Sequence, residues 1–276
     1  MTASFTVACV QMNSGDSVPE NLARAGELLR RAADGGAEFA ALPEYFAVMA
    51  ADEKRKLAVA EKDGAGPIQE FLAAAAARFR MHLVGGAIPL RAPGGRVFSS
   101  CLLFAPDGKR IARYDKMHLF RFDGKIDETE TIAPGDSVVA ADTPLGRIGL
   151  AVCYDVRFPE LFRAMNSPDI LVIPSAFTPE TGAAHWRLLL RARAVENLAH
   201  VIAPAQAGTH PGGRETFGDS VVIDGWGRIL NAAKTRGDEI VFAKINAEER
   251  ATQRARLPAL SHRLLSDGGL RKKEKQ

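Results

Sequence analysis

The sequence predicts an α/β fold of one domain, residues 1–276, built on mixed rather than purely parallel β-structure. Three observations support this prediction. Short apolar segments alternate with segments whose apolar residues recur at helical spacing along the full length. Hairpins are indicated near both ends, which argues against a purely parallel sheet. No linker, repeat or low-complexity segment divides the chain.

The first half of the chain alternates strands and helices up to a polar loop. Apolar residues at helical spacing predict helices over residues 19–33 and 68–80. The strands that we expect here cover residues 5–12, 39–42, 82–88, 97–104 and 110–114. Asp107-Gly108 is a hairpin turn between the last two strands. Residues 119–134 are polar and irregular, which predicts a long loop, and loops of that length are often functional.

The second half continues with shorter strands. A buried strand is predicted over residues 149–152, a helix from Pro159 onward, and a second helix over 186–198. The remaining strands are expected at 170–174, 201–205, 221–223, 228–230 and 240–245. The pair at 221–223 and 228–230 flanks a glycine-containing turn, which indicates a hairpin.

Composition and charge exclude several classes of function. The net charge of +3 is too small to indicate nucleic acid or a membrane surface as a partner. The basic run at residues 271–276 is expected to be a frayed, solvated tail. No apolar run approaches the ~20 residues of a membrane span, and the N-terminus lacks the features of a signal peptide. Three scattered cysteines form no disulfide framework. We therefore expect a cytoplasmic, reduced protein.

Cys153 is the candidate nucleophile. It ends the apolar run that begins at Ile148, and it is followed by charged residues and a Pro-Glu helix start. A thiol at the carboxyl end of a buried strand occupies a common position for a nucleophile. The alternative is that Cys153 is a small core residue. We expect that role for Cys9 and Cys101, which lie within predicted strands.

Two charged residues also follow predicted strands. Glu44 comes just after residues 39–42, and Lys116 comes just after residues 110–114. A sheet can bring both to one rim with Cys153, because α/β sheets tend to bind ligands at the carboxyl ends of their strands. Taken singly, Glu44 is equally compatible with a helix cap or surface acid, and Lys116 with a solvated loop lysine.

The segments around these three residues resemble the nitrilase superfamily of carbon–nitrogen hydrolases. That family carries a Glu–Lys–Cys triad in the patterns L-P-E, Y-x-K-x-H-L and C-Y-D-x-R-F-P-E, in this order. The matching segments here are Leu42-Pro43-Glu44, Tyr114-Asp115-Lys116-Met117-His118-Leu119 and Cys153-Tyr154-Asp155-Val156-Arg157-Phe158-Pro159-Glu160. The Nit subgroup is similar at residues 174–178, 181–182, 185–186, 190–197 and 206–210. The resemblance covers a core of about residues 5–260.

The resemblance implies amide hydrolysis through a thioester, without a metal or organic cofactor. Glu44 would be the general base for Cys153 and then the acid that protonates the leaving amine. Lys116 and a backbone N–H near Tyr154 would stabilise the oxyanion, at about 3–4 kcal/mol per donor. A second family glutamate, six residues before a Pro-Gly, would hold the lysine and orient the substrate amide.

Two residues compete for the role of this second glutamate. Glu128 has the family spacing from Pro134-Gly135, with Thr129 in place of the usual serine. Glu130 is the alternative, because it lies in the same acidic segment.

The resemblance also implies a fold, an assembly and a substrate. The expected fold is a four-layer αββα sandwich whose outer helices pair into a homodimer or a higher homo-oligomer. Within the Nit subgroup the chain is most similar to amidases that convert deaminated glutathione to 2-oxoglutarate and cysteinylglycine. The alternatives are an ω-amidase acting on 2-oxoglutaramate, another amidase, carbamoylase or nitrilase, and a catalytically silent interaction protein.

Both favoured substrates are anionic, which predicts cations in the pocket beyond the triad. Arg157 is the first candidate, with a salt bridge to Asp155 or Glu160 as the structural alternative. Further candidates in loops are Arg121, Lys125 and Arg214. The remaining residues that we expect to contact the substrate are Tyr154, Phe177 and Thr178.

Overall fold

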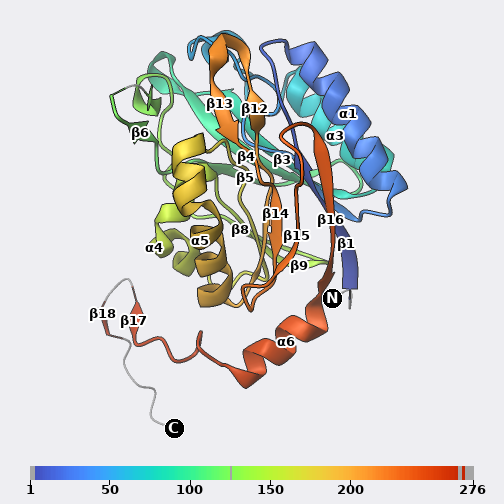
Figure 1. The fold of residues 1–276 in the computed structure, drawn as a ribbon, viewed down its shortest axis with the longest axis vertical. Coiled ribbons are helices and arrows are strands. Elements are labelled where there is room, and N and C mark those ends of the chain that lie inside the picture. Colours follow the sequence, from blue (N-terminus) through green and yellow to red (C-terminus); the bar gives the residue numbers. More distant parts are fainter. Residues whose placement is uncertain (1–3, 125, 267–268, 271–276) are drawn as a thin grey trace.

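Two six-stranded sheets form the framework of the molecule (Figure 1). The structure is a computed structural model that describes residues 4–124, 126–266 and 269–270. The first sheet has the order β16-β1-β2-β3-β4-β5, which are Glu239–Asn246, Ser4–Gln11, Phe39–Ala41, His82–Arg91, Val97–Phe104 and Arg110–Asp115. The second has the order β15-β14-β11-β10-β9-β8, which are Ile229–Ala232, Val221–Ile223, His200–Ala203, Ile170–Val172, Gly146–Leu150 and Ala140–Thr143. Both sheets are mixed, because β1-β2-β3 and β9-β10-β11 run parallel while the other neighbours are antiparallel.

The alternation of side chains along β1 explains the layers of the first sheet. Val7 and Cys9 belong to an apolar core that both sheets share. Val10 belongs to a second core, which lies under α1 (Val18–Asp34) and α3 (Pro67–Phe79). Because successive strand residues point to opposite faces, one face of this sheet meets the second sheet and the other face meets helices.

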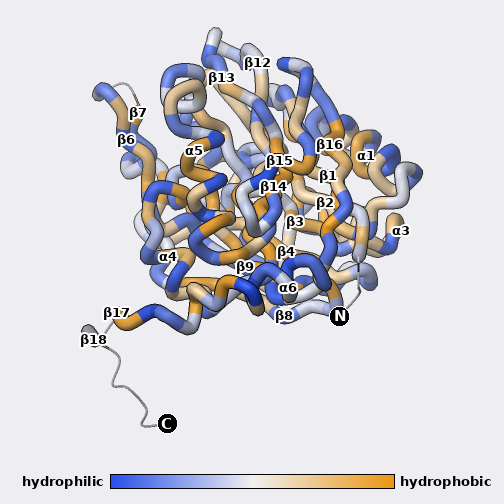
Figure 2. Tube along the Cα trace, turned by 60° about the horizontal axis from the view of Figure 1, so that its bottom comes forward, coloured by the Kyte–Doolittle hydropathy of each residue, from blue (hydrophilic) through white to orange (hydrophobic). Residues whose placement is uncertain are grey.

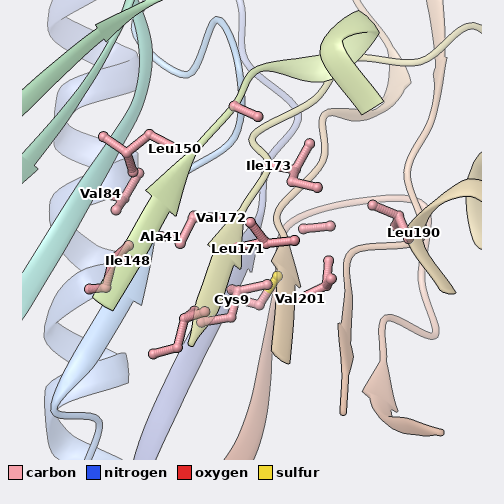
Figure 3. Close-up of a cluster of buried hydrophobic side chains, with 14 of the residues drawn as sticks. Cys9, Ala41, Val84, Ile148, Leu150, Leu171, Val172, Ile173, Leu190 and Val201 are labelled. Carbon is pink, nitrogen blue, oxygen red and sulfur yellow. The ribbon is translucent and has the colours of Figure 1, made fainter. Parts of the chain in front are cut away.

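The second sheet also has one face on the shared core and the other face covered by helices. Its inner face packs on the first sheet, and α4 (Pro159–Ala164) and α5 (Pro179–Asn197) cover its outer face (Figure 1). The shared core in Figure 3 includes Cys9, Ala41 and Val84 from the first sheet and Ile148, Leu150 and Val172 from the second. The layers therefore follow the order helix, sheet, sheet, helix, and the predicted αββα sandwich is confirmed.

Shorter elements complete the described chain. The helical ones are α2 (Arg55–Ala58), α6 (Ala247–Arg256) and the 3-10 turns η1 (Pro93–Gly95), η2 (Glu128–Glu130), η3 (Cys153–Arg157) and η4 (Pro211–Gly213). Three hairpins stand outside the large sheets: β6–β7 (Arg121–Phe122 with Ile126–Asp127), β12–β13 (Ala207–Thr209 with Glu215–Phe217) and β17–β18 (Leu265–Ser266 with Gly269–Leu270). Figure 2 shows α6 as hydrophilic, which is why no apolar stripe in the sequence announced it.

Several predicted elements differ from the structure, and α2, α6, β8 and the hairpin β12–β13 were not predicted. The expected loop at 119–134 contains β6, β7 and η2. The helix predicted from residue 186 begins at Pro179, because Thr178 caps it by accepting a hydrogen bond from the Thr181 N–H (3.3 Å). Its first turns hold small and polar residues without an apolar period. The strand predicted at 149–152 ends at Leu150, so Cys153 opens η3 instead of ending a strand.

The remaining predictions concern membrane spans, the division into domains and the C-terminal tail. No helix in the described ranges combines the length and apolar character needed to cross a bilayer. The division into a single domain stays a prediction. The basic tail at residues 271–276 lies outside the described residues.

Gly86 lets β3 approach the turn that follows β2. Its φ is +55°, and a Cβ there would overlap the carbonyl oxygen of Pro43. The same turn is tied to β3 by the Tyr45 N–H, which donates to the Ala87 carbonyl (3.1 Å). A side chain at position 86 would therefore push this turn away from the sheet.

We predict that Gly86→Ala lowers the free energy of unfolding by about 2–5 kcal/mol, which combines left-handed strain with overpacking against rigid backbone. Gly94→Ala is the matched control, because Gly94 also has a positive φ (+70°) but has no atom within 4 Å of its Cβ position. It should lose only about 1–2 kcal/mol. Urea denaturation of both variants measures the difference, and equal losses would contradict the close approach.

Candidate active site

Glu44 is delivered by the turn that follows β2. The Leu42 N–H donates to the Val84 carbonyl (2.9 Å), and Glu44 itself forms a parallel bridge with Ala87 of β3. The side chain is 1% exposed. The next residue, Tyr45, has a φ of +58°, a left-handed conformation that is rare outside glycine. Strain of this kind persists only where the surroundings hold it, and here β3 does so.

Lys116 lies directly after β5 and is fully buried. Its N–H donates to the Ser99 carbonyl (3.0 Å), which extends the pairing of β5 with β4 by one residue. Its Nζ lies 2.9 Å from Glu44 Oε1, and 2.9 Å and 2.8 Å from Oε1 and Oε2 of Glu128. One buried ammonium thus bridges two buried carboxylates. Glu44, Lys116 and Glu128 are called the inner ion cluster below.

Glu128 rather than Glu130 meets Lys116. Besides binding Nζ, its carboxylate accepts hydrogen bonds from the Tyr45 hydroxyl (2.7 Å) and from the Phe120 N–H (2.7 Å). Glu130 is exposed two residues further along η2. The hairpin β6–β7 folds the polar segment back on itself, which is how Glu128 comes to lie beside Phe120.

Cys153 opens η3 with a φ of +50° and is 7% exposed. Its N–H donates to the Pro174 carbonyl (2.9 Å), which joins it to the segment after β10. The Glu44 carboxylate and the Lys116 ammonium both lie close enough to act on the pKa of its thiol. The structure therefore brings together the three predicted triad residues and Glu128.

Asp155 joins the segment that carries Lys116 to the segment that carries Cys153. Its fully buried carboxylate accepts hydrogen bonds from the Tyr114 hydroxyl (2.7 Å) and the Val152 N–H (2.9 Å). It also accepts from the backbone N–H of His118 (3.1 Å) and lies 2.7 Å from Nδ1 of that ring. Sequence reasoning considered Asp155 only as a salt-bridge partner, since nothing in the motif shows which strand its carboxylate reaches.

A small cavity opens beside Cys153. Its lining includes all four residues predicted to contact substrate, together with four others: Phe120, Cys153, Tyr154, Arg157, Ala176, Phe177, Thr178 and Thr181. Apolar and aromatic surface dominates this lining, and Arg157 supplies its one full charge. Small-molecule sites commonly combine an apolar wall with a few fixed polar groups in this way.

The contacts of Arg157 are not those of the salt bridge considered as its structural alternative. Its guanidinium contacts Nδ1 of His185 (3.2 Å) and lies 5.7 Å and 5.6 Å from the ring centres of Tyr154 and Phe177. In the described part of the chain, no carboxylate lies within ion-pair distance of it, and the Asp155 carboxylate is taken by Tyr114, His118 and the Val152 N–H. The expected salt bridge to Asp155 or Glu160 is therefore wrong.

The other cations predicted to lie at the site do not line the Cys153 cavity in the described residues. Arg121 pairs with Asp127 (2.9 Å) and its side chain is 71% exposed. Lys125 lies outside the described residues. Arg214 lies near Tyr45 and pairs with Glu53 (2.6 Å).

Burial and the inner ion cluster set the protonation states. Burial raises the pKa of the Cys153 thiol well above its ordinary value, and Glu44 adds to this, whereas Lys116 opposes it. Burial also raises the pKa of Glu44. Burial disfavours the Lys116 ammonium, but both carboxylates outweigh it and hold that pKa well above its ordinary value. For Glu128, the ammonium and the hydrogen bonds outweigh burial and lower the pKa.

These directions define what the site can do. The resting thiol is protonated, Lys116 is a permanent cation, and Glu44 is the carboxylate with the greater proton affinity. In the described ranges no group of three or more His, Cys, Asp or Glu side chains is placed to share a metal ion. The expectation that the reaction needs no cofactor stays a prediction.

The fold places a buried Glu–Lys–Glu cluster beside a cysteine. A family model described as carbon–nitrogen hydrolase matches residues 6–255, and the chain belongs to that family. The predicted family resemblance is confirmed.

Named relatives lie close in sequence and in structure. A deaminated glutathione amidase of Synechocystis is 39% identical over 270 residues, which cover 94% of this chain and 98% of that protein. An ω-amidase of Bos taurus is 38% identical over 267 residues, which cover 95% of each. The crystal structure of a nitrilase-superfamily protein of Saccharomyces cerevisiae has a TM-score of 0.84 at 32% identity, covering 94% of this chain and 96% of that one.

The directions of the pKa shifts predict how Cys153 reacts with iodoacetamide. The thiolate is the reacting form, so alkylation should accelerate only above pH 9.0, the ordinary thiol value. Lys116→Met should move this rise to higher pH, because it removes the cation that favours the thiolate. Glu44→Gln should move it to lower pH, because it removes an anion.

Mass spectrometry of the alkylated peptides measures the profile for each cysteine. Lys109→Met is the control, since Lys109 is a surface lysine with an 85% exposed side chain. Cys9 and Cys101 should stay unmodified in the folded protein because both are fully buried. Shifts of the same sign in Lys116→Met and Glu44→Gln would contradict the assigned electrostatics.

Proposed function

We propose that this chain is an amidase in which Cys153 is the nucleophile and Glu44, Lys116 and Glu128 assist it. The observation that carries the proposal is the inner ion cluster, held beside a cavity that contains the thiol. Burying three charges is costly unless they are paired. A catalytic role would account for the presence of these three charged side chains in the protein interior.

The first half of the reaction would form a thioester. Because the resting thiol is protonated, its proton passes to Glu44 as sulfur attacks the amide carbon. The carbonyl electron pair becomes an oxyanion, which Lys116 and a backbone N–H near Tyr154 stabilise. The C–N bond then breaks, and Glu44 returns the proton to the departing amine.

The second half would release the acid. Glu44 takes a proton from water, whose oxygen attacks the thioester carbon. The C–S bond breaks, and the sulfur recovers the proton from Glu44. Glu128 fixes Lys116 throughout, and its lowered pKa keeps it ionised for that purpose.

We propose deaminated glutathione as the substrate, with 2-oxoglutaramate as the alternative. Both carry the same 2-oxoglutaryl acyl group and differ in the leaving amine. Arg157 would bind the carboxylate of the acyl group at the far side of the Cys153 cavity, with Tyr154, Phe177 and Thr178 around the carbon chain. The names of the relatives favour neither substrate decisively, since 39% and 38% identity are nearly equal.

We further propose that the protein pairs through α5 into a homodimer. Two apolar residues of that helix are exposed, Leu188 at 68% and Val195 at 46%, and exposed Trp226 (47%) extends the apolar surface. Exposed apolar patches of this kind are typical of protein interfaces. The cytoplasmic location stays a prediction.

Cys153→Ala should abolish turnover of every amide substrate while the thermal midpoint changes little, because the residue borders a cavity. Cys101→Ala is the matched control and should retain the catalytic rate constant while losing stability, since Cys101 is fully buried in the shared core. Ammonia or amine release is the readout. Substantial turnover by Cys153→Ala would eliminate the thioester mechanism.

The wild-type protein should have a higher kcat/KM for deaminated glutathione than for 2-oxoglutaramate, measured by formation of 2-oxoglutarate. Arg157→Met should raise KM for both substrates alike, because both present the same acyl carboxylate. A strong preference for 2-oxoglutaramate would make the protein an ω-amidase. Turnover of neither would restrict the proposal to other amides.

A further inference from the structure

A second, small cavity borders the ring of Tyr45. Three charged residues in its lining form a group that we call the outer ion cluster: Glu53, Lys56 and Arg214. Glu53 Oε1 accepts from Arg214 Nη1 (2.6 Å), and Glu53 Oε2 pairs with the Lys56 ammonium. The fourth charged residue of the lining, Asp52, accepts a hydrogen bond from the Lys54 N–H (2.8 Å).

Tyr45 connects this cavity to the candidate active site. Its hydroxyl donates to Glu128 of the inner ion cluster (2.7 Å). Its side chain packs with Ala176, which lines the Cys153 cavity. A ligand that extends from Cys153 past Tyr45 would therefore reach the outer ion cluster.

The two cations of the outer ion cluster are more buried than its anion. Lys56 and Arg214 lie 5.1 Å and 5.9 Å from the centre of the Tyr45 ring, a distance at which cations are attracted to aromatic faces. Their side chains are only 7% and 26% exposed, whereas that of Glu53 is 46% exposed. A buried cation needs a counter-charge, and here the counter-charge comes from the most exposed member of the cluster.

We infer that the outer ion cluster is the subsite for the carboxylate of the leaving amine, and that Glu53 occupies this subsite until the substrate displaces it. The inference rests on the proposed amidase function. It identifies the ligand as an amide whose amine part ends in a carboxylate, as cysteinylglycine does. The exchange conserves charge, because one carboxylate replaces another between the same two cations.

The length of the leaving group sets the reach that this placement requires. An extended dipeptide spans about 7 Å, so the proposal places the glycine carboxylate within about that distance of the scissile amide. The acyl carboxylate would lie at Arg157, in the other cavity. The two carboxylates of deaminated glutathione would thus bind at opposite ends of the site, with the reacting amide between them.

The pair of substrates isolates this subsite, because 2-oxoglutaramate has the same acyl group and releases only ammonia. The quantity to measure is the ratio of kcat/KM for deaminated glutathione to kcat/KM for 2-oxoglutaramate. Any general effect of a substitution on the inner ion cluster cancels in this ratio. Loss of a charged hydrogen bond should lower the ratio about tenfold or more in Arg214→Met and in Lys56→Met.

Three further arms complete the experiment. Glu53→Gln should raise the ratio, because it removes the competing carboxylate. Arg121→Met should leave the ratio unchanged, since that exposed cation pairs with Asp127 and lines neither cavity. Deaminated glutathione amidated at its glycine carboxylate should lose about tenfold in kcat/KM on the wild-type protein, a measurement that does not depend on how any variant folds.

The outcomes separate the two proposals. An unchanged ratio in Arg214→Met and Lys56→Met, with an amidated substrate that reacts as fast as the acid, would overturn the subsite and leave the amidase intact. Hydrolysis of neither substrate by the wild-type protein would overturn both. A lowered ratio in these two variants with a raised ratio in Glu53→Gln would establish the subsite and the role of Glu53.

Discussion

The ammonium of Lys116 between the carboxylates of Glu44 and Glu128 is the interaction on which the rest of the site depends. All three groups are buried, so removal of one partner would leave an uncompensated charge, at a cost of about 3–5 kcal/mol. The three residues come from three separate segments: the turn after β2, the residue after β5, and η2. The polar segment that carries Glu128 has little regular secondary structure to hold it in place. Its course is therefore fixed by the pairing of Glu128 with Lys116.

Backbone strain and one buried carboxylate bring the nucleophile to this cluster. Tyr45 and Cys153 both have positive φ without being glycine. Each begins a sharp turn shortly after the carboxyl end of a strand, β2 and β9 respectively. Asp155 holds the second turn by accepting hydrogen bonds from the Val152 N–H, which follows β9, and from the Tyr114 hydroxyl in β5 of the other sheet. Strain in the Tyr45 turn is thus offset within its own sheet, and strain in the Cys153 turn by a hydrogen bond that crosses the sandwich.

The sequence was sufficient for the order of the strands of the two large sheets apart from β8, and for α1, α3 and α4, because each apolar period reports burial directly. It could not reveal α6, whose buried face consists of Ala247, Arg250 and Gln253, or the early start of α5. The residues of the inner ion cluster were found through their motifs, since isolated Glu and Lys carry no signal of burial. The outer ion cluster was mostly missed, because Glu53 and Lys56 lie in a charged segment that resembles any solvated surface, and only the fold brings them to Arg214.

The arrangement of charge accounts for the proposed selection of substrate at the ends of the site. With both carboxylates ionised, the inner ion cluster has a net charge of −1, which burial screens little. A doubly anionic substrate is repelled from such a centre, so its carboxylates must lie away from Glu44 and Glu128. Arg157 lies at one end, on the aromatic wall of the Cys153 cavity. Lys56 and Arg214 lie at the other end, beyond Tyr45. A neutral amide bond between two anionic ends matches this pattern: negative at the reacting centre and positive at both limits.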